Sequence, residues 1–272
     1  MYLRYFGFKE APFSITPDPA FLFFSESHRT ALNQLKYGLN EGVGFMVLIG
    51  EVGTGKTTLS RKLMEEMRND RRQYFEFAQI LNPRQNETQL LFSILHDLGQ
   101  VPASRDQGEL QAQLQEYLEG RAAVGKRVVL LVDEAQNLDF EGLEQIRLLS
   151  NFETDKRKLL QIILLGQPEL RKRLRRPELR QVRQRVAISC QLQALQREET
   201  LRYIRHRLQI AEAQRPPHFK SLALRLVYWR SRGVPRVINH LCERCLMASF
   251  AKSESTIGLS EALRATFEVG RI

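Results

Sequence analysis

The sequence has 272 residues, of which 43% are hydrophobic and 26% are charged, so it has the length and apolar content of one large or two small globular domains. This composition argues against a mostly disordered chain, and three cysteines argue against a disulfide scaffold. The longest apolar runs are too short to span a bilayer and no signal-peptide pattern is present, so we expect a cytoplasmic protein.

The charge is distributed unevenly along the chain. Lysine and arginine outnumber the acidic residues by 41 to 31, a formal net charge of +10. Residues 1–155 carry 16 basic and 22 acidic side chains, whereas residues 156–272 carry 25 basic and 9 acidic ones. This asymmetry predicts an anionic partner for the second half of the chain, or anionic chemistry beside it.

The pattern along the first part of the chain predicts an α/β fold. Residues 1–25 are rich in aromatic residues and prolines, so we expect no long helix there, but a segment that lies across a folded surface. After it, short apolar runs predict buried parallel strands at residues 45–49, 74–79, 128–132, 159–165 and 186–192. Amphipathic stretches between them predict helices at residues 27–40, 56–69, 87–98, 109–123 and 141–151. This alternation indicates a parallel sheet with helices on both faces.

From Arg197 onward the strand pattern disappears. Helical spacing predicts helices at residues 198–213, 220–231, 234–251 and 260–267. We therefore expect an α/β core over residues 1–195, which includes the aromatic and proline-rich amino-terminal linker, and a small helical domain over residues 196–272.

A phosphate-binding loop is predicted directly after the first strand. Residues 50–57 read GEVGTGKT, which fits the pattern G-x-x-x-x-G-K-[ST] between a strand and a helix. Lys56 is expected to reach the β- and γ-phosphates, and the Thr57 hydroxyl to hold Mg²⁺. The predicted cofactors are ATP and Mg²⁺, and the residues expected to contact the nucleotide are Glu51, Val52, Gly53, Thr54, Gly55, Lys56, Thr57 and Thr58.

Polar residues end two later strands. Asp133 and Glu134 follow the strand at 128–132, where Asp133 suits Mg²⁺ coordination and Glu134 suits a general base that polarises the attacking water. Two adjacent carboxylates with distinct roles predict hydrolysis rather than binding alone. Gln167 follows the strand at 159–165, where its amide is expected between phosphate and water.

Taken together, these segments resemble an AAA+ ATPase, and more narrowly the secretion-pathway ATPases of the GspA/ExeA type. The resemblance covers nearly the whole chain and depends on YFGF at 5–8, PFSITPDP at 12–19, GEVGTGKT at 50–57, DEAQN at 133–137, GQPEL at 166–170 and GVPR at 233–236. It implies a P-loop AAA+ core followed by an all-helical lid domain, with ATP–Mg²⁺ bound between them. More distant relatives are ATPases of pilus biogenesis and polysaccharide export, and transposition helpers of the TniB/TnsC type.

The resemblance also implies roles for two arginines. Arg236 matches the lid arginine that contacts the γ-phosphate, and its guanidinium can pair with phosphate in a bidentate way. The family's arginine finger precedes the last core strand, where Arg180, Arg183 and Arg185 are candidates and Arg185 is favoured. A finger acts on a neighbouring subunit, so it implies a homo-oligomer, with a ring as one form of it.

The predicted partner follows from the same resemblance. We expect ATP hydrolysis to drive assembly of a cell-envelope secretion, pilus or polysaccharide-export machine, through a protein partner that can hold the chain at the inner membrane. Longer GspA/ExeA proteins continue into a membrane span and a peptidoglycan-binding region, whereas this sequence stops after the helical domain, so we expect no membrane span of its own.

Two alternatives to this function stay open. One is a nucleic-acid-associated ATPase of the transposition-helper type, and the other is a nucleotide switch that recruits a partner. Residues 171–185 carry eight basic side chains and one acidic one, which indicates either a solvated face or an anion-binding surface.

Three smaller features have structural interpretations. Cys242 and Cys245 form a C-x-x-C pattern without a second pair, so we expect buried thiols rather than a zinc or redox site. His28 and Phe24 are expected to pack in the core, with a place near the nucleotide pocket as the alternative that the resemblance implies.

Overall fold

The computed structural model describes residues 1–69, 74–102, 104–154 and 157–269. The chain divides into two compact units, each with its own hydrophobic core. We call them the α/β unit, which comprises Ser27–Glu51 and Leu59–Leu192, and the helical unit, which comprises Met1–Glu26, Val52–Thr58 and Gln193–Ile272.

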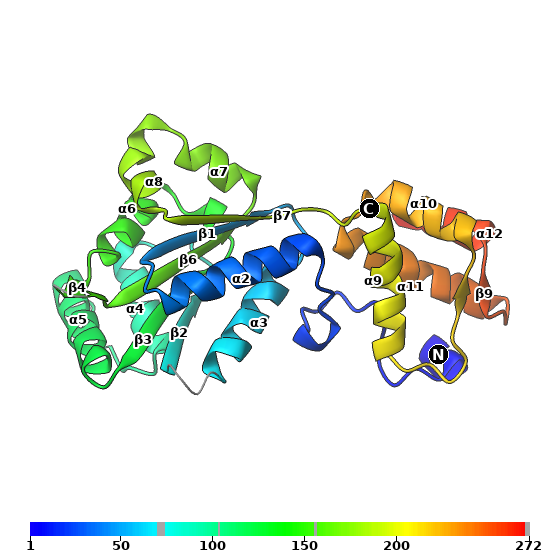
Figure 1. Cartoon of the computed structure of the whole chain (residues 1–272), viewed down its shortest axis with the longest axis horizontal. Coiled ribbons are helices and arrows are strands. Elements are labelled where there is room, and N and C mark those ends of the chain that lie inside the picture. Colours follow the sequence, from blue (N-terminus) through cyan, green and yellow to red (C-terminus); the bar gives the residue numbers. More distant parts are fainter. Residues whose placement is uncertain (70–73, 103, 155–156, 270–272) are drawn as a thin grey trace. The chain divides into compact units, whose positions relative to one another are not determined.

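The α/β unit is built on a parallel sheet (Figure 1). Within the described residues this sheet has five strands, in the order β2 (Tyr74–Ile80), β3 (Lys126–Val132), β6 (Leu160–Gly166), β1 (Phe45–Gly50) and β7 (Ile188–Leu192). Every residue of β1 and β6 is buried, as is typical of central parallel strands that are covered on both faces. The structure confirms the predicted fold class and each of the predicted strands, the last of which begins at Ile188 rather than at residue 186.

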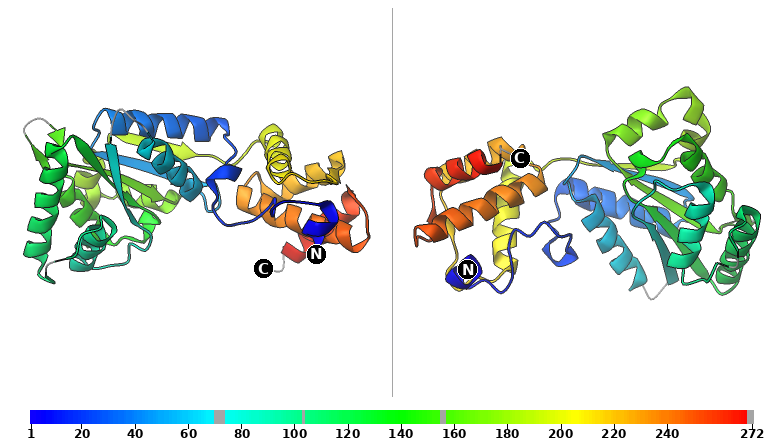
Figure 2. Two further views of the ribbon diagram at one scale, coloured as in Figure 1. Left: turned by 90° about the horizontal axis from the view of Figure 1, so that it is seen from below. Right: turned by 180° about the vertical axis from the view of Figure 1, so that it is seen from behind.

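Helices cover both faces of this sheet (Figures 1 and 2). Alternate residues of a strand point to opposite faces. Val47 and Ile49 of β1 share a core with apolar residues of α4 (Glu87–Asp97), α5 (Gln107–Ala123) and α6 (Phe140–Leu149). The opposite face is covered by α2 (Glu26–Asn40) and α3 (Lys56–Arg68). There the Gln161 amide of β6 donates to the Leu39 carbonyl at 3.2 Å, which fixes α2 against the sheet.

Side-chain caps set the starts of several helices. The Asn86 side chain accepts from the Gln89 backbone N–H at 2.8 Å, and the Gln89 side chain accepts from the Asn86 N–H at 3.2 Å. This capping box satisfies two donors that the first turn of α4 leaves without helical partners. Asp106 and Asp139 cap α5 and α6 in the simpler way, through one backbone N–H each.

The basic segment after β6 is helical, which the sequence patterns did not predict. It forms α7 (Pro168–Leu174), a short 3₁₀ turn η3 (Pro177–Leu179) and α8 (Arg180–Arg185). Two short strands, β4 (Glu153–Thr154) and β5 (Arg157–Lys158), pair in antiparallel fashion before β6.

The helical unit contains the four predicted helices. They are α9 (Arg197–Ile210), α10 (Ser221–Ser231), α11 (Pro235–Ala251) and α12 (Leu259–Val269). The sequence predicted no strand in this part, but β8 (His218–Phe219) and β9 (Thr256–Ile257) form a short parallel pair. Gly233 separates α10 from α11 as predicted. Only glycine suits this position, because its φ is +76° and a Cβ there would lie 1.9 Å from the Leu195 carbonyl oxygen.

The amino-terminal segment packs on these helices. It forms α1 (Tyr2–Phe6) and the 3₁₀ turn η1 (Pro19–Phe21). Phe6 and Phe13 are buried in one core with Ile238 and Leu241 of α11, and Phe23 stacks edge-on against Tyr203 of α9. The prediction that this segment lies across a folded surface agrees with the structure, and the surface belongs to the helical unit rather than to the α/β core.

A buried carboxylate joins the start of α12 to the end of α11. Glu261 is 4% exposed and forms an ion pair with Lys252. Burial alone would raise the pKa of Glu261, but hydrogen bonds from Lys252, Ser260 and the Gly258 backbone N–H outweigh it and lower the pKa to about 2. No helix in the described part of the chain is both long and apolar enough to cross a membrane.

Candidate functional site

The predicted phosphate loop follows β1 at a reversal in the strand order. β1 lies between β6 and β7, although the chain forms β2 and β3 before either of these. Ile49 of β1 pairs with Gly166 of β6, and Val132 of β3 pairs with Leu164, so the carboxyl ends of these strands lie at one edge. Open parallel sheets bind ligands outside this edge, where the strand order reverses. Glu51 begins the loop at this position.

The loop has the backbone conformation that its glycines predict. The φ angles of Gly53 and Gly55 are +78° and +98°, in the left-handed region that favours glycine. Thr54 is fully buried and Lys56 is 6% exposed. Lys56 begins α3, so the positive end of a helix dipole lies at this loop. A loop of this kind that leads into a helix N-terminus is typical of phosphate sites.

Arg236, the predicted lid arginine, lies beside the phosphate loop. It is the second residue of α11, and its backbone N–H donates to the Gly53 carbonyl at 3.3 Å. A Cβ at position 53 would lie 2.5 Å from the Arg236 Cβ. Glycine at this position is therefore required twice, once by the positive φ angle and once by the close approach of Arg236.

The two carboxylates after β3 differ in environment. Asp133 is 4% exposed, and its Oδ1 accepts from the Glu134 backbone N–H at 2.8 Å. Glu134 is half-buried and has φ +51°, a left-handed conformation that a glutamate seldom adopts. Strained backbone of this kind is found disproportionately at functional sites. Here the left-handed residue leads from the end of β3 into the 3₁₀ turn η2 (Ala135–Asn137).

Two glutamines hold the Glu134 carboxylate. Gln167 donates from Nε2 to Glu134 Oε2 at 3.1 Å, and Gln136 Nε2 donates to the same oxygen. The Gln167 backbone N–H in turn donates to Gln136 Oε1 at 3.0 Å. The structure thus brings together Glu134 and Gln167, which the sequence analysis singled out separately. It adds Gln136, whose only signal was its place in the DEAQN run.

Two of the predicted site residues carry oxygen atoms of the kind that Mg²⁺ prefers. Thr57 offers a hydroxyl at the start of α3, and Asp133 offers a carboxylate at the end of β3. Mg²⁺ in such sites takes one or two protein carboxylates and completes its shell with phosphate oxygens and water. The described residues contain no group of three or more His, Cys, Asp or Glu that could hold a metal ion.

The candidate finger arginines lie on or next to the exposed face of α8. The Arg185 guanidinium donates to Asn151 Oδ1 at 2.6 Å, and the Arg183 guanidinium lies 3.4 Å from the Arg175 carbonyl oxygen. Neither contact involves Glu134 or Gln167. The assignment of Arg185 as a finger stays a prediction.

The cysteines of the C-x-x-C pattern lie in the core of the helical unit. Cys242 and Cys245 are fully buried and not disulfide-bonded. Burial raises the pKa of both thiols, that of Cys245 to about 12, which makes them poor nucleophiles and poor metal ligands. His28 is 3% exposed, as expected of a residue that packs in the core.

Comparison with known proteins decides the family. Residues 39–174, half of the chain, match the model of the AAA domain. The chain belongs to this family. Over its whole length it is 44% identical to General secretion pathway protein A of Aeromonas hydrophila, of which it spans 49%, about half the relative's length.

Solved structures with the same fold share little sequence with this AAA domain chain. Cdc6p of Pyrobaculum aerophilum has a TM-score of 0.74 at 20% identity, with 95% of this chain and 70% of that one covered. The Aeropyrum pernix ORC2 protein, solved with ADPNP and ADP, has a TM-score of 0.70 at 15% identity, with coverages of 96% and 72%. The ORC1 protein of the same organism, solved with DNA, has a TM-score of 0.72 at 14% identity, with coverages of 96% and 70%. At these identities the likeness concerns the fold.

Proposed function

We propose that this chain is a magnesium-dependent ATPase. The observation that carries the proposal is the geometry of Glu134, a carboxylate at the carboxyl edge of the sheet in a strained backbone conformation and held by two amides. A residue that only bound nucleotide would not need such orientation, whereas a general base must be aimed at its water. The AAA domain match and the glycine-rich loop support ATP as the nucleotide.

Each residue of the site has a role in this proposal. Lys56 and the N–H groups at the start of α3 bind the phosphates, and Arg236 pairs with the terminal phosphate. Thr57 and Asp133 hold the magnesium ion, which neutralises phosphate charge when bound. Both glutamine amides donate to Glu134 Oε2, so Oε1 is the oxygen assigned to accept a proton from the attacking water.

Two variants separate binding from hydrolysis. Lys56→Ala should abolish binding of a fluorescent ATP analogue, because the charge that neutralises the phosphates is lost. Glu134→Gln should still bind the analogue, while ATP turnover falls by roughly 100-fold or more. Lys62→Ala, on the same helix as Lys56, and Glu141→Gln, at the surface of α6, are the matched controls. Parental turnover in Glu134→Gln would refute the assigned base.

We further propose that the active form is an oligomer with Arg185 in the neighbour's site. The support is the exposed position of Arg185 at the end of α8. Arg185→Ala should bind ATP and fail to hydrolyse it, since a finger stabilises charge that develops in the transition state. Mixing it with Glu134→Gln should restore some turnover, because a mixed interface can pair an intact finger with an intact base. If oligomers shown to contain both variants recovered no ATP turnover, this would contradict the proposal that Arg185 acts across the subunit interface.

The cellular role we propose is assembly of a cell-envelope secretion machine from the cytoplasmic side, through a protein partner. The support is the 44% identity to General secretion pathway protein A across the whole chain. Deletion of the gene should reduce secretion of a reporter protein, and a Glu134→Gln copy should not restore it. Restoration by that copy would favour a nucleotide switch, in which bound ATP alone recruits the partner.

A second candidate function is a nucleic-acid-associated ATPase, favoured by the basic second half of the chain. It predicts that duplex DNA stimulates turnover at about 0.15 M salt, where surface charges more than about 8 Å apart are largely screened. Under the secretion proposal we expect little or no stimulation.

A further inference from the structure

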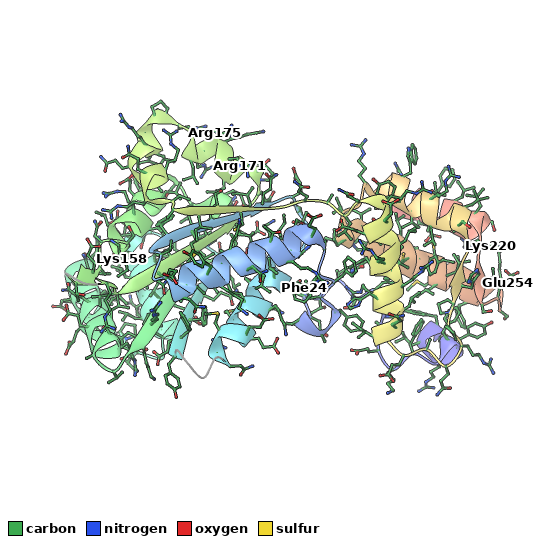
Figure 3. All side chains as sticks on the ribbon, in the orientation of Figure 1. Phe24, Lys158, Arg171, Arg175, Lys220 and Glu254 are labelled. Atoms are coloured by element: carbon green, nitrogen blue, oxygen red, sulfur yellow. The ribbon has the colours of Figure 1, made fainter. Side chains whose placement is uncertain are left out.

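The basic segment that the proposed ATPase mechanism leaves largely unused forms one surface on the α/β unit. We call it the α7–α8 basic surface, and its members are Arg171, Lys172, Arg173, Arg175, Arg176, Arg180, Arg183 and Arg185. Six of these eight side chains are exposed. Figure 3 marks Arg171 in α7 and Arg175 directly after it.

This surface is held rigidly by the core beneath it. Leu170 and Leu174 of α7, Leu179 of η3 and Val182 of α8 are buried in the main core of the α/β unit. Their burial anchors both short helices, so the backbone that carries the basic residues is held in place. Like charges gathered on one surface repel one another and are suited to a partner that supplies the opposite charge.

Ion pairing distinguishes this surface from other basic residues of the described chain. Elsewhere basic side chains pair with nearby acids, as Lys36 does with Glu66 at 2.8 Å and Arg147 with Glu144 at 2.7 Å. Within the part of the chain that the structure describes, no member of the α7–α8 basic surface forms an ion pair. Arg171 and Arg185 instead donate to the side-chain oxygens of Gln191 and Asn151.

A groove lined by charged, polar and apolar residues adjoins the cations. Arg173 and Arg176 line it together with Phe140, which is 50% exposed, and the buried Leu179. The Arg173 guanidinium donates to the Leu138 carbonyl, which fixes it at the groove. Asp139 and Glu178 also contribute to the lining. The groove therefore offers cations, an exposed aromatic ring and carboxylates side by side.

We propose that this groove and the α7–α8 basic surface bind an acidic, partly apolar segment of a partner protein. Arginines pair with carboxylates in a bidentate way, and Phe140 offers a contact for an apolar side chain. A mixed protein segment can place acidic side chains against the arginines and neutral ones against Asp139 and Glu178, whereas a nucleic-acid backbone carries a phosphate at every step and cannot avoid these carboxylates. The inference names the class of partner for the proposed secretion ATPase and so rests on that function.

The test measures binding of the full chain to fluorescent probes at about 0.15 M salt, by anisotropy. The probes are a short peptide of glutamates with two phenylalanines, a glutamate-only peptide of equal length, and duplex DNA. The surface variant replaces Lys172, Arg175 and Arg176 with Glu. The matched control reverses three exposed arginines of the helical unit, Arg202, Arg205 and Arg225.

We expect the surface variant to bind the mixed peptide at least about tenfold more weakly, and the control to change its affinity by less than about twofold. Phe140→Ala should weaken the mixed peptide more than the glutamate-only peptide. The proposal would be overturned if the two charge-reversal variants lost affinity equally, or if the mixed peptide did not bind the parent chain measurably. It would also be overturned if DNA bound more tightly than the mixed peptide and the surface variant abolished that binding. ATP binding of the variants, followed in parallel, reports separately on the proposed ATPase function, because none of these residues belongs to the nucleotide site.

Discussion

Arg207 holds the amino-terminal segment on the helical unit, and its replacement tests that attachment. The side chain lies on α9 and is 7% exposed. Its guanidinium donates from Nε to the Pro12 carbonyl, from Nη2 to the Ser14 carbonyl at 3.1 Å and from Nη1 to the Tyr203 hydroxyl at 3.1 Å. It also lies 4.7 Å from the centre of the Phe21 ring. Methionine can fill the same space but donates none of these bonds.

The expected loss of stability follows from which acceptors are left without a donor. The Ser14 carbonyl keeps the Asn239 amide at 3.2 Å, whereas no other donor among the described residues reaches the Pro12 carbonyl. A hydrogen bond to a charged group contributes about 1.5–3 kcal/mol, and removing the charge also removes the cost of burying it. We therefore expect Arg207→Met to lower the free energy of unfolding by about 2–4 kcal/mol.

Urea unfolding followed by circular dichroism measures this change, with Arg205→Met as the control. Arg205 lies exposed on the same helix, and its replacement should change stability by less than about 0.5 kcal/mol. Limited proteolysis should cut the Arg207→Met variant faster within residues 9–18, because their attachment is weakened. A loss below about 1 kcal/mol, or a cleavage pattern like that of the control, would refute the proposed role.

Three further predictions concern the loop and the helical unit. Gly53→Ala should abolish binding of the fluorescent ATP analogue, because the new Cβ meets both a positive φ and the Arg236 side chain. Cys242 and Cys245 should react with a thiol reagent only in denaturant, since burial raises the pKa of both; fast labelling of the native chain would contradict this. The pKa of Glu261 is about 2 in the folded chain, below its usual unfolded value of about 4.3, so its contribution of about 3 kcal/mol is complete above the unfolded pKa and is lost as pH falls towards 2. Glu261→Gln should remove this part of the acid sensitivity when unfolding is measured against pH.

The sequence predicted the sheet well because its strands are buried on both faces. A central parallel strand such as Phe45–Gly50 has no solvent side, so its residues form an uninterrupted apolar run that is easy to recognise. The short helices α7 and α8 lack that advantage. They bury only every third or fourth residue, such as Leu170, Leu174 and Val182, and the arginines between them mask the period.

The site was predictable where backbone geometry limits the residue type. Glycines at positions 53 and 55 are required by positive φ angles, and polar residues at strand ends follow from the parallel sheet. Gln136 was missed because its role depends on a contact between side chains. Such contacts form only after the turn at Glu134 has brought the Gln136 amide and the Gln167 amide to one carboxylate oxygen.

The same distinction explains why charge alone gave two interpretations of the basic half. A count of arginines does not separate a solvated face from a binding surface, because both have the same composition. The difference lies in what surrounds each cation. Arg207 is enclosed and donates to backbone oxygens of its own chain, so it stabilises the fold. Arg175 and Arg176 are exposed above a buried leucine core and form no ion pair among the described residues, so their charge is available to something outside the chain. Charge reversal at these positions should therefore change binding and leave the free energy of unfolding nearly unchanged, whereas Arg207→Met should do the opposite.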